Sequence, residues 1–191
     1  MTTRLHLMCS AATASVSAVA FPADEPLDRR GRESLAELSS RLPSCDVILR
    51  SPARAAAATA EGLSLDAQAE PLLRDCDFGC WAGRSLVEVQ AEAPAAVADW
   101  LHNPRAAPHG GESFAEVMTR VGGWMDGLLA GYGSVLAITH ASVIRAAIAH
   151  ALGARPETFS HIDVAPLTRA RLSRHGGRWT LAALVSAKDE R

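Results

Sequence analysis

The chain has 191 residues, of which 48% are hydrophobic and 21% are charged, and its formal net charge is -2. This size and balance fit a single globular domain over residues 1–191 with one well-filled core. Without basic runs or a basic excess, neither nucleic acid nor a membrane surface is expected as a partner. No apolar stretch is long enough to span a bilayer.

The four cysteines do not form a metal-binding pattern. Cys76 and Cys80 are separated by three residues, and no second pair completes a tetrahedral site. The apolar run within residues 1–10 is too short for a signal peptide and fits a strand better. We therefore expect reduced thiols in a cytoplasmic protein that carries neither a metal nor a cofactor.

The N-terminal half alternates strand-like and helix-like segments, which is typical of an α/β domain. Residues 5–8 form the first predicted strand, and Asp28 is predicted to cap a helix that ends at Pro43. The apolar face of that helix carries three leucines: Leu35, Leu38 and Leu42. A second strand is predicted over 47–49, and an alanine-rich helix over 51–61.

The middle of the chain is predicted to be an ordered loop over 72–83, because helical periodicity is missing there. A helical insertion interrupted by prolines follows at about 84–111. Residues 112–129 form the clearest predicted helix of the chain. The adjacent Gly122 and Gly123 weaken this helix locally and indicate close packing.

The C-terminal part begins with a buried strand predicted over 135–139 and a helix after it. Residues 168–173 and 178–184 are predicted to form a hairpin around a tight Gly-Gly turn. No internal repeat or linker divides the chain. These elements predict an α/β fold, a three-layer sandwich with a mostly parallel central sheet.

Four separated segments carry motifs in a fixed order. The first, residues 5–13, reads Leu-His-Leu-Met-Cys-Ser-Ala-Ala-Thr, and the second, residues 26–32, reads Pro-Leu-Asp-Arg-Arg-Gly-Arg. The third comprises Ser51-Pro52 to Glu61 and the loop 73–83, and the fourth comprises 108–113 and Thr139-His140-Ala-Ser-Val-Ile-Arg145. Together they resemble the histidine phosphatase superfamily, which is phosphoglycerate mutase-like in fold, and in particular its α-ribazole phosphatase-type branch.

The resemblance implies a specific chemistry. In that family a histidine at the end of the first strand attacks phosphorus, and a second histidine lies opposite it. Two arginines clamp the phosphate oxygens and an acid protonates the leaving group. Such a cationic site stabilises the negative charge of the phosphoryl group during transfer.

Carried over by the motifs, this chemistry is incomplete in the present chain. The first arginine corresponds to Cys9 and the nucleophilic histidine to Ser10. The second arginine corresponds to Ala55, whereas Asp75 stands at the position of the acid. Of these groups only the second histidine, His140, is unchanged, so the resemblance implies a degenerate site.

Other residues are expected beside the pocket. Arg54 precedes Ala55, but one step along a helix turns a side chain by about 100°, so Arg54 is a poor replacement for the missing arginine. The motifs also place Thr13 and Ala141 at the pocket. From the insertion, which is expected to roof it, positive charge could come from four residues: Arg84, His102, Arg105 and His109.

Three functions remain open from the sequence. The first is a pseudoenzyme that retains a pocket for a small-molecule ligand, a phosphate ester among the candidates. The second is an active phosphomonoesterase or other hydrolase that uses Ser10, Cys9 or water with His140 and Asp75. The third is a phosphatase whose missing groups come from the insertion.

The setting of this function is indicated only by short segments. Residues 22–27 and 75–77 resemble the branch of the family associated with cobalamin metabolism. A homodimer is compatible with the expected edge strand and apolar helix faces.

Overall fold

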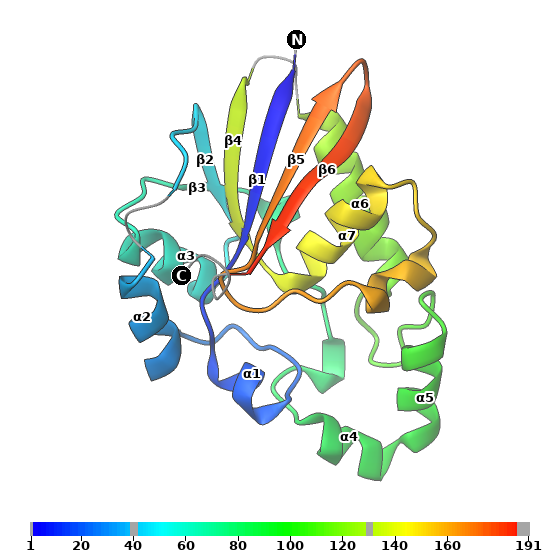
Figure 1. The fold of residues 1–191 in the computed structure, drawn as a ribbon. Coiled ribbons are helices and arrows are strands. Elements are labelled where there is room, and N and C mark those ends of the chain that lie inside the picture. Colours follow the sequence, from blue (N-terminus) through cyan, green and yellow to red (C-terminus); the bar gives the residue numbers. More distant parts are fainter. Residues whose placement is uncertain (1, 39–41, 129–131, 187–191) are drawn as a thin grey trace.

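The computed structural model describes residues 2–38, 42–128 and 132–186, in which six strands form one sheet (Figure 1). Its order is β3-β2-β4-β1-β5-β6. The bounds are β1 Thr3–Cys9, β2 Val47–Arg50, β3 Gln68–Ala69, β4 Ser134–Thr139, β5 Arg169–His175 and β6 Arg178–Val185. The first four strands in this order pair in parallel, and the hairpin of β5 and β6 adds two antiparallel pairings. The mainly parallel α/β sheet and the C-terminal hairpin are as predicted.

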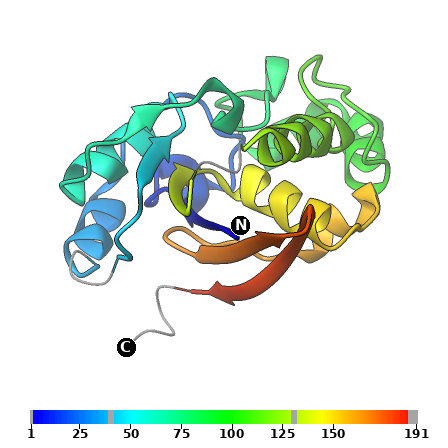
Figure 2. The ribbon, with the colours of Figure 1, turned by 90° about the horizontal axis from the view of Figure 1, so that it is seen from above.

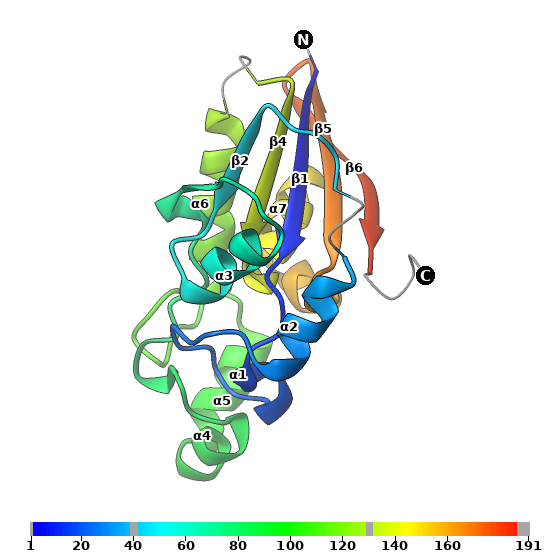
Figure 3. The same ribbon diagram turned by 90° about the vertical axis from the view of Figure 1, so that its left-hand side faces the viewer.

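Helices cover both faces of the sheet and create three layers (Figures 2 and 3). The four covering helices are α2 Arg29–Ala36, α3 Arg54–Gly62, α6 Phe114–Gly127 and α7 Ala141–Ala151. Alternation along β1 explains why both faces are apolar, because successive side chains point to opposite sides. Leu5 and Leu7 are buried in the core with α6 and α7, whereas Met8 is buried in the core with α2 and α3.

The helix that Asp28 caps is shorter than the sequence predicts. The helix capped by Asp28 ends at Ala36 and does not reach Pro43. The Leu38 amide bonds the carbonyl of Leu35, which tightens the last turn and directs Leu38 into the core. Residues 39–41 lie outside the described ranges.

The paired glycines of α6 do not behave alike. A Cβ at Gly122 would lie 2.7 Å from the His150 ring, so the close packing predicted there is confirmed. At Gly123 a Cβ would meet nothing within 4 Å, so the prediction is wrong for that residue.

Three helices, α1 Ala14–Ala18, α4 Leu86–Glu92 and α5 Pro94–His102, lie beyond the carboxyl ends of the strands, at the bottom of Figure 1. The loop before α4 contains the short 3-10 turns η1 Pro71–Leu73 and η2 Gly79–Trp81, and a third, η3 Pro156–His161, precedes β5. An aromatic cluster joins α5 to this loop. The ring centroid of Phe21 lies 5.3 Å from that of Phe78, 5.1 Å from that of Trp81 and 5.4 Å from that of Trp100.

Candidate functional site

A cavity of about 520 Å³ opens at the carboxyl ends of β1, β2 and β4, and we call it the strand-end cavity. Parallel strands that end at one edge bring the residues that follow them together. Ser51, His140 and Ser10 directly follow β2, β4 and β1, which are neighbours in that order. His140 therefore lies between two serines.

His140 bonds one of these serines. Its Nε2 lies 2.8 Å from Oγ of Ser51, and its Nδ1 lies 3.5 Å from Oδ2 of Asp75. The carboxylate favours a proton on Nδ1, so in the neutral ring Nε2 accepts a hydrogen bond from the Ser51 hydroxyl. Ser51 is fully buried and does not line the cavity, so it orients the imidazole and does not meet a ligand.

Asp75 is fixed by further donors. Its Oδ1 accepts hydrogen bonds from the Cys76 amide at 2.8 Å and from the Ser142 hydroxyl. Arg120 of α6 stabilises the loop that carries Asp75. Its guanidinium donates to the carbonyls of three loop residues and, at 2.8 Å, to the carboxylate of Glu112. The Arg120 side chain is only 9% exposed.

Ser10 lines the cavity but lacks a base. It is 8% exposed, and its hydroxyl makes no hydrogen bond to another residue of the described ranges. Nε2 of His140, which the serine-hydrolase hypothesis needs for Ser10, is taken by Ser51. The geometry therefore does not bring Ser10 and His140 together as nucleophile and base.

Cys9 also lines the cavity, at the position where the resemblance expects an arginine. Burial, followed by the nearby carboxylate of Asp75, raises the pKa of the Cys9 thiol to about 12. At neutral pH the thiol stays protonated and is a poor nucleophile. Ala55, at the other arginine position, lines the cavity as well.

The remaining predicted residues divide into two groups. Thr13 and Ala141 line the cavity, with Oγ1 of Thr13 3.0 Å from Oγ of Ser15. Arg54, Arg84 and His109 do not line it.

Each of these three has a reason for its position. Arg54 is exposed on α3, as the helical step predicted, and Arg84 pairs with Glu92 at 2.6 Å. His109 is buried against Trp81, with ring centroids 5.1 Å apart, and burial lowers its pKa. The insertion 84–111 supplies no side chain to the lining, all of which lies in the described ranges, so the expected roof contacts are not formed.

Three lining carboxylates were missed by the sequence predictions: Asp24, Glu25 and Asp77. The first two lie in a loop without periodicity, beside prolines, and nothing in their spacing relates them to the strand ends. Ser51 and Ser142 were missed as well, although Ser51 has a usable signal in its position directly after a predicted strand.

Other classes of site are not formed within these ranges. No group of three or more histidine, cysteine or acidic side chains there could hold a metal ion. No described helix combines the length and the apolar character needed to cross a membrane.

Comparison with known proteins gives a family description and curated relatives. The family described as the histidine phosphatase superfamily (branch 1) matches residues 11–187. A bifunctional protein of Mycobacterium tuberculosis is 32% identical over 125 residues, which cover 63% of this chain and 34% of that protein. The glucosyl-3-phosphoglycerate phosphatase of Mycolicibacterium vanbaalenii is 39% identical over 106 residues, which cover 51% of this chain and 46% of that protein. The matches thus span less than half the length of these relatives.

Solved structures superpose over nearly the whole chain. The α-ribazole phosphatase of Shigella flexneri gives a TM-score of 0.86 at 26% identity and covers 96% of each chain. A mycobacterial glucosyl-3-phosphoglycerate phosphatase, solved with inorganic phosphate, gives a TM-score of 0.79 at 26% identity and covers 97% of this chain and 98% of that one.

Proposed function

Because the chain belongs to the histidine phosphatase superfamily (branch 1), we propose that it is a member which binds a small ligand without forming a phosphohistidine. One observation carries this proposal. The lining of the strand-end cavity, all of it within the described ranges, contains neither arginine nor lysine. Phosphoryl transfer needs positive charge around the transferred group, and a serine at position 10 cannot become a phosphohistidine.

The retained groups support binding. His140 and Asp75 line the cavity, and the hydrogen bonds to Ser51 and Ser142 hold both side chains in fixed orientations. A preorganised pair of this kind can position a ligand whether or not chemistry follows.

A second candidate, hydrolysis by an activated water, is favoured by the same pair. Both ring nitrogens of His140 have partners, Ser51 and Asp75, so the base that activates the water is the Asp75 carboxylate, which lines the cavity and is positioned by the imidazole at 3.5 Å. Ser10 and Cys9 are weaker agents for this reaction, because Ser10 lacks a base and the Cys9 thiol is protonated.

The experiment compares the wild-type protein with a variant that restores the missing groups, Cys9→Arg, Ser10→His and Ala55→Arg together, against para-nitrophenyl phosphate. Loss of a nucleophile from a cooperative catalytic set costs on the order of 10⁶ in turnover in other enzymes. We therefore expect turnover in the triple variant and none above background in the wild type.

Two controls make the assay decisive. Circular dichroism establishes that the triple variant folds, and Ala57→Arg, two residues after Ala55 on α3 and outside the cavity lining, introduces an arginine in the wrong register. Wild-type turnover equal to that of the triple variant would contradict the proposal. Wild-type turnover that His140→Asn abolishes would support the second candidate.

The setting is part of the proposal. Four free cysteines support a reducing, cytoplasmic location. Superposition on an α-ribazole phosphatase supports a place beside the cobalamin-associated branch, and the outer edge of β6 offers a surface for a homodimer.

A further inference from the structure

The charge of the strand-end cavity is opposite to the charge that a phosphate ester requires. Four carboxylates line it, from Asp24, Glu25, Asp75 and Asp77. The imidazole of His140 is the one basic side chain in the lining, which belongs entirely to the described ranges. A phosphate monoester carries a charge of about -1.5 to -2 near neutral pH, so this lining repels it.

Three of these carboxylates are held by uncharged donors. Asp24 accepts a hydrogen bond from the Arg54 backbone amide at 2.8 Å, and Glu25 accepts one from the Ser15 amide at 3.3 Å. Asp77 accepts one from a backbone amide at 2.8 Å. Within the described residues no ion pair involves any of the three. Their negative charge therefore remains available to a ligand.

Ser10 is an independent sign of a ligand. The residue is only 8% exposed, it lines the same cavity, and its hydroxyl has no hydrogen-bond partner among the described residues. The hydroxyl is not sealed in the protein interior but reaches the cavity, so a ligand there can donate a hydrogen bond to it.

The rest of the lining is largely apolar and includes Val16, Phe78 and Val164. We propose that the strand-end cavity takes a small organic cation, an amine or guanidine with an apolar body, and selects against phosphate esters. This inference rests on the proposed function, because it names the ligand class of the same cavity. The cationic group donates to the carboxylates and to the Ser10 hydroxyl, and the apolar body packs against the valines and the aromatic ring. A volume of about 520 Å³ lies in the usual range for small-ligand pockets.

The test uses three probes that share one apolar body and differ in charge. Benzylamine is a cation, benzyl alcohol is neutral and benzyl phosphate is an anion. Binding is measured by the NMR chemical-shift changes of cavity residues on titration. We expect benzylamine to bind about ten-fold more tightly than benzyl alcohol, and benzyl phosphate to bind more weakly than either.

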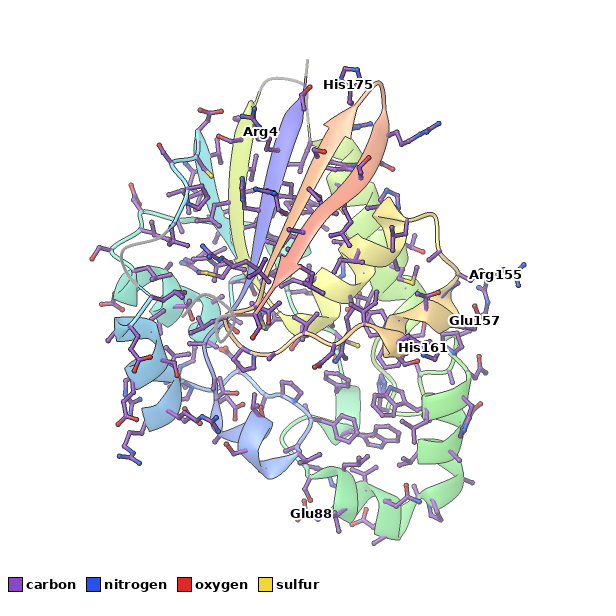
Figure 4. All side chains as sticks on the ribbon, viewed as in Figure 1. Arg4, Glu88, Arg155, Glu157, His161 and His175 are labelled. Atoms are coloured by element: carbon purple, nitrogen blue, oxygen red, sulfur yellow. The ribbon has the colours of Figure 1, made fainter. Side chains whose placement is uncertain are left out.

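Isosteric variants test whether the carboxylates of the cavity cause the preference for benzylamine over benzyl alcohol. Asp24→Asn and Glu25→Gln keep an oxygen for the backbone donors but remove the charge. Each is expected to reduce the ratio of benzylamine to benzyl alcohol affinity by about three-fold or more. Glu157→Gln, at an exposed carboxylate away from the cavity (Figure 4), leaves the ratio unchanged. Ser10→Ala weakens benzylamine and benzyl alcohol alike, because both donate to the hydroxyl.

Several results would overturn the inference: tightest binding of benzyl phosphate, equal affinities for all three probes, no benzylamine binding at millimolar concentration, or a ratio that Asp24→Asn and Glu25→Gln leave unaltered. Phosphate release from benzyl phosphate is followed in the same samples. Release by the wild type counts against the proposed function, whereas the affinity ratio alone decides the ligand class, so the two failures are distinguishable.

Discussion

Two hollows of the molecule carry opposite charges, although the whole chain has a formal charge of only -2. One is the strand-end cavity, and the other lies on the part of the sheet that carries His6, Arg169 and Arg171, which we call the outer face of β1 and β5. Carboxylates line the cavity, whereas a second hollow of about 510 Å³ on the outer face is lined in part by His6, Arg169 and Arg171. Arg4 lies on the same strand as His6, at the end of the sheet far from α4 and α5 (Figure 4). Net charge therefore conceals where this molecule favours anions and where it favours cations.

The largest expected effect concerns the missing arginines. It tests whether their absence, and not only the absence of the nucleophilic histidine, prevents phosphatase activity. Ser10→His restores the nucleophile but leaves Cys9 and Ala55 in place of the two arginines. We expect no measurable phosphatase turnover from this single variant, several orders of magnitude below the triple variant, because no arginine stabilises the transferring group. Turnover with para-nitrophenyl phosphate is the measurement. Substantial activity of the single variant would contradict the view that the missing positive charge prevents phosphoryl transfer.

The thiols provide a second comparison between cavity and surface. With a pKa of about 12, Cys9 has about one thiolate in 10⁴ at pH 8, whereas Cys80 is exposed. Iodoacetamide at pH 8 should alkylate Cys80 and leave Cys9 unmodified, as read by peptide mass spectrometry. Cys80→Ser serves as the control and removes the fast-reacting site. Rapid alkylation of Cys9 in the folded protein would show that its environment is less apolar than described.

Arg120 and Arg171 compare an arginine beneath the cavity with one on the outer face. Arg120 is buried and bonded to Glu112 and to loop carbonyls, whereas Arg171 is exposed. Arg120→Met removes the buried one of the two arginines that pair with Glu112, together with the bonds to the loop carbonyls, and should lower the free energy of unfolding by about 3 kcal/mol. Arg171→Met should change it by about 0.5 kcal/mol or less. Urea denaturation measures both, and equal losses would contradict the role given to Arg120.

The smallest effect concerns two histidines in the two regions. Burial lowers the pKa of both, but the neighbouring arginines, Arg171 foremost, lower that of His6 further, whereas Asp77 partly raises that of His109. NMR titration of the rings should show that Arg171→Gln raises the pKa of His6 and that Asp77→Asn lowers the pKa of His109. Shifts of the opposite sign would place the charges elsewhere.

Stability follows from the same shift. The folded pKa of His6 lies below its ordinary value of 6.5, so the unfolded chain binds the proton more readily. The contribution of neutral His6 to the free energy of unfolding is complete above pH 6.5 and is lost as the pH falls through the folded pKa. His6→Gln should therefore flatten the decline of stability on the acid side.

Much of the fold could be predicted from the sequence, because apolar runs and motif order are local signals. The three-layer, phosphoglycerate mutase-like α/β fold is confirmed by the superposed structures. The end of α2 was missed, because the last turn depends on how Leu38 reaches the core and not on its spacing from Leu35.

The site was less predictable, since its geometry depends on strand order. Ser51 meets His140 only because β2 lies beside β4, and no local pattern contains that information. His109 was expected at the pocket but is held by aromatic rings distant in sequence. Motifs therefore gave the positions that follow the strands, while packing decided which side chains face the cavity.

The aromatic cluster gives the protein an intrinsic optical reporter. Phe78 lines the cavity and contacts Phe21, whose ring touches both Trp81 and Trp100. A ligand that displaces Phe78 changes the surroundings of two indoles, whose emission wavelength depends on the polarity around them. Occupancy of the cavity can therefore be followed by tryptophan fluorescence, without any label.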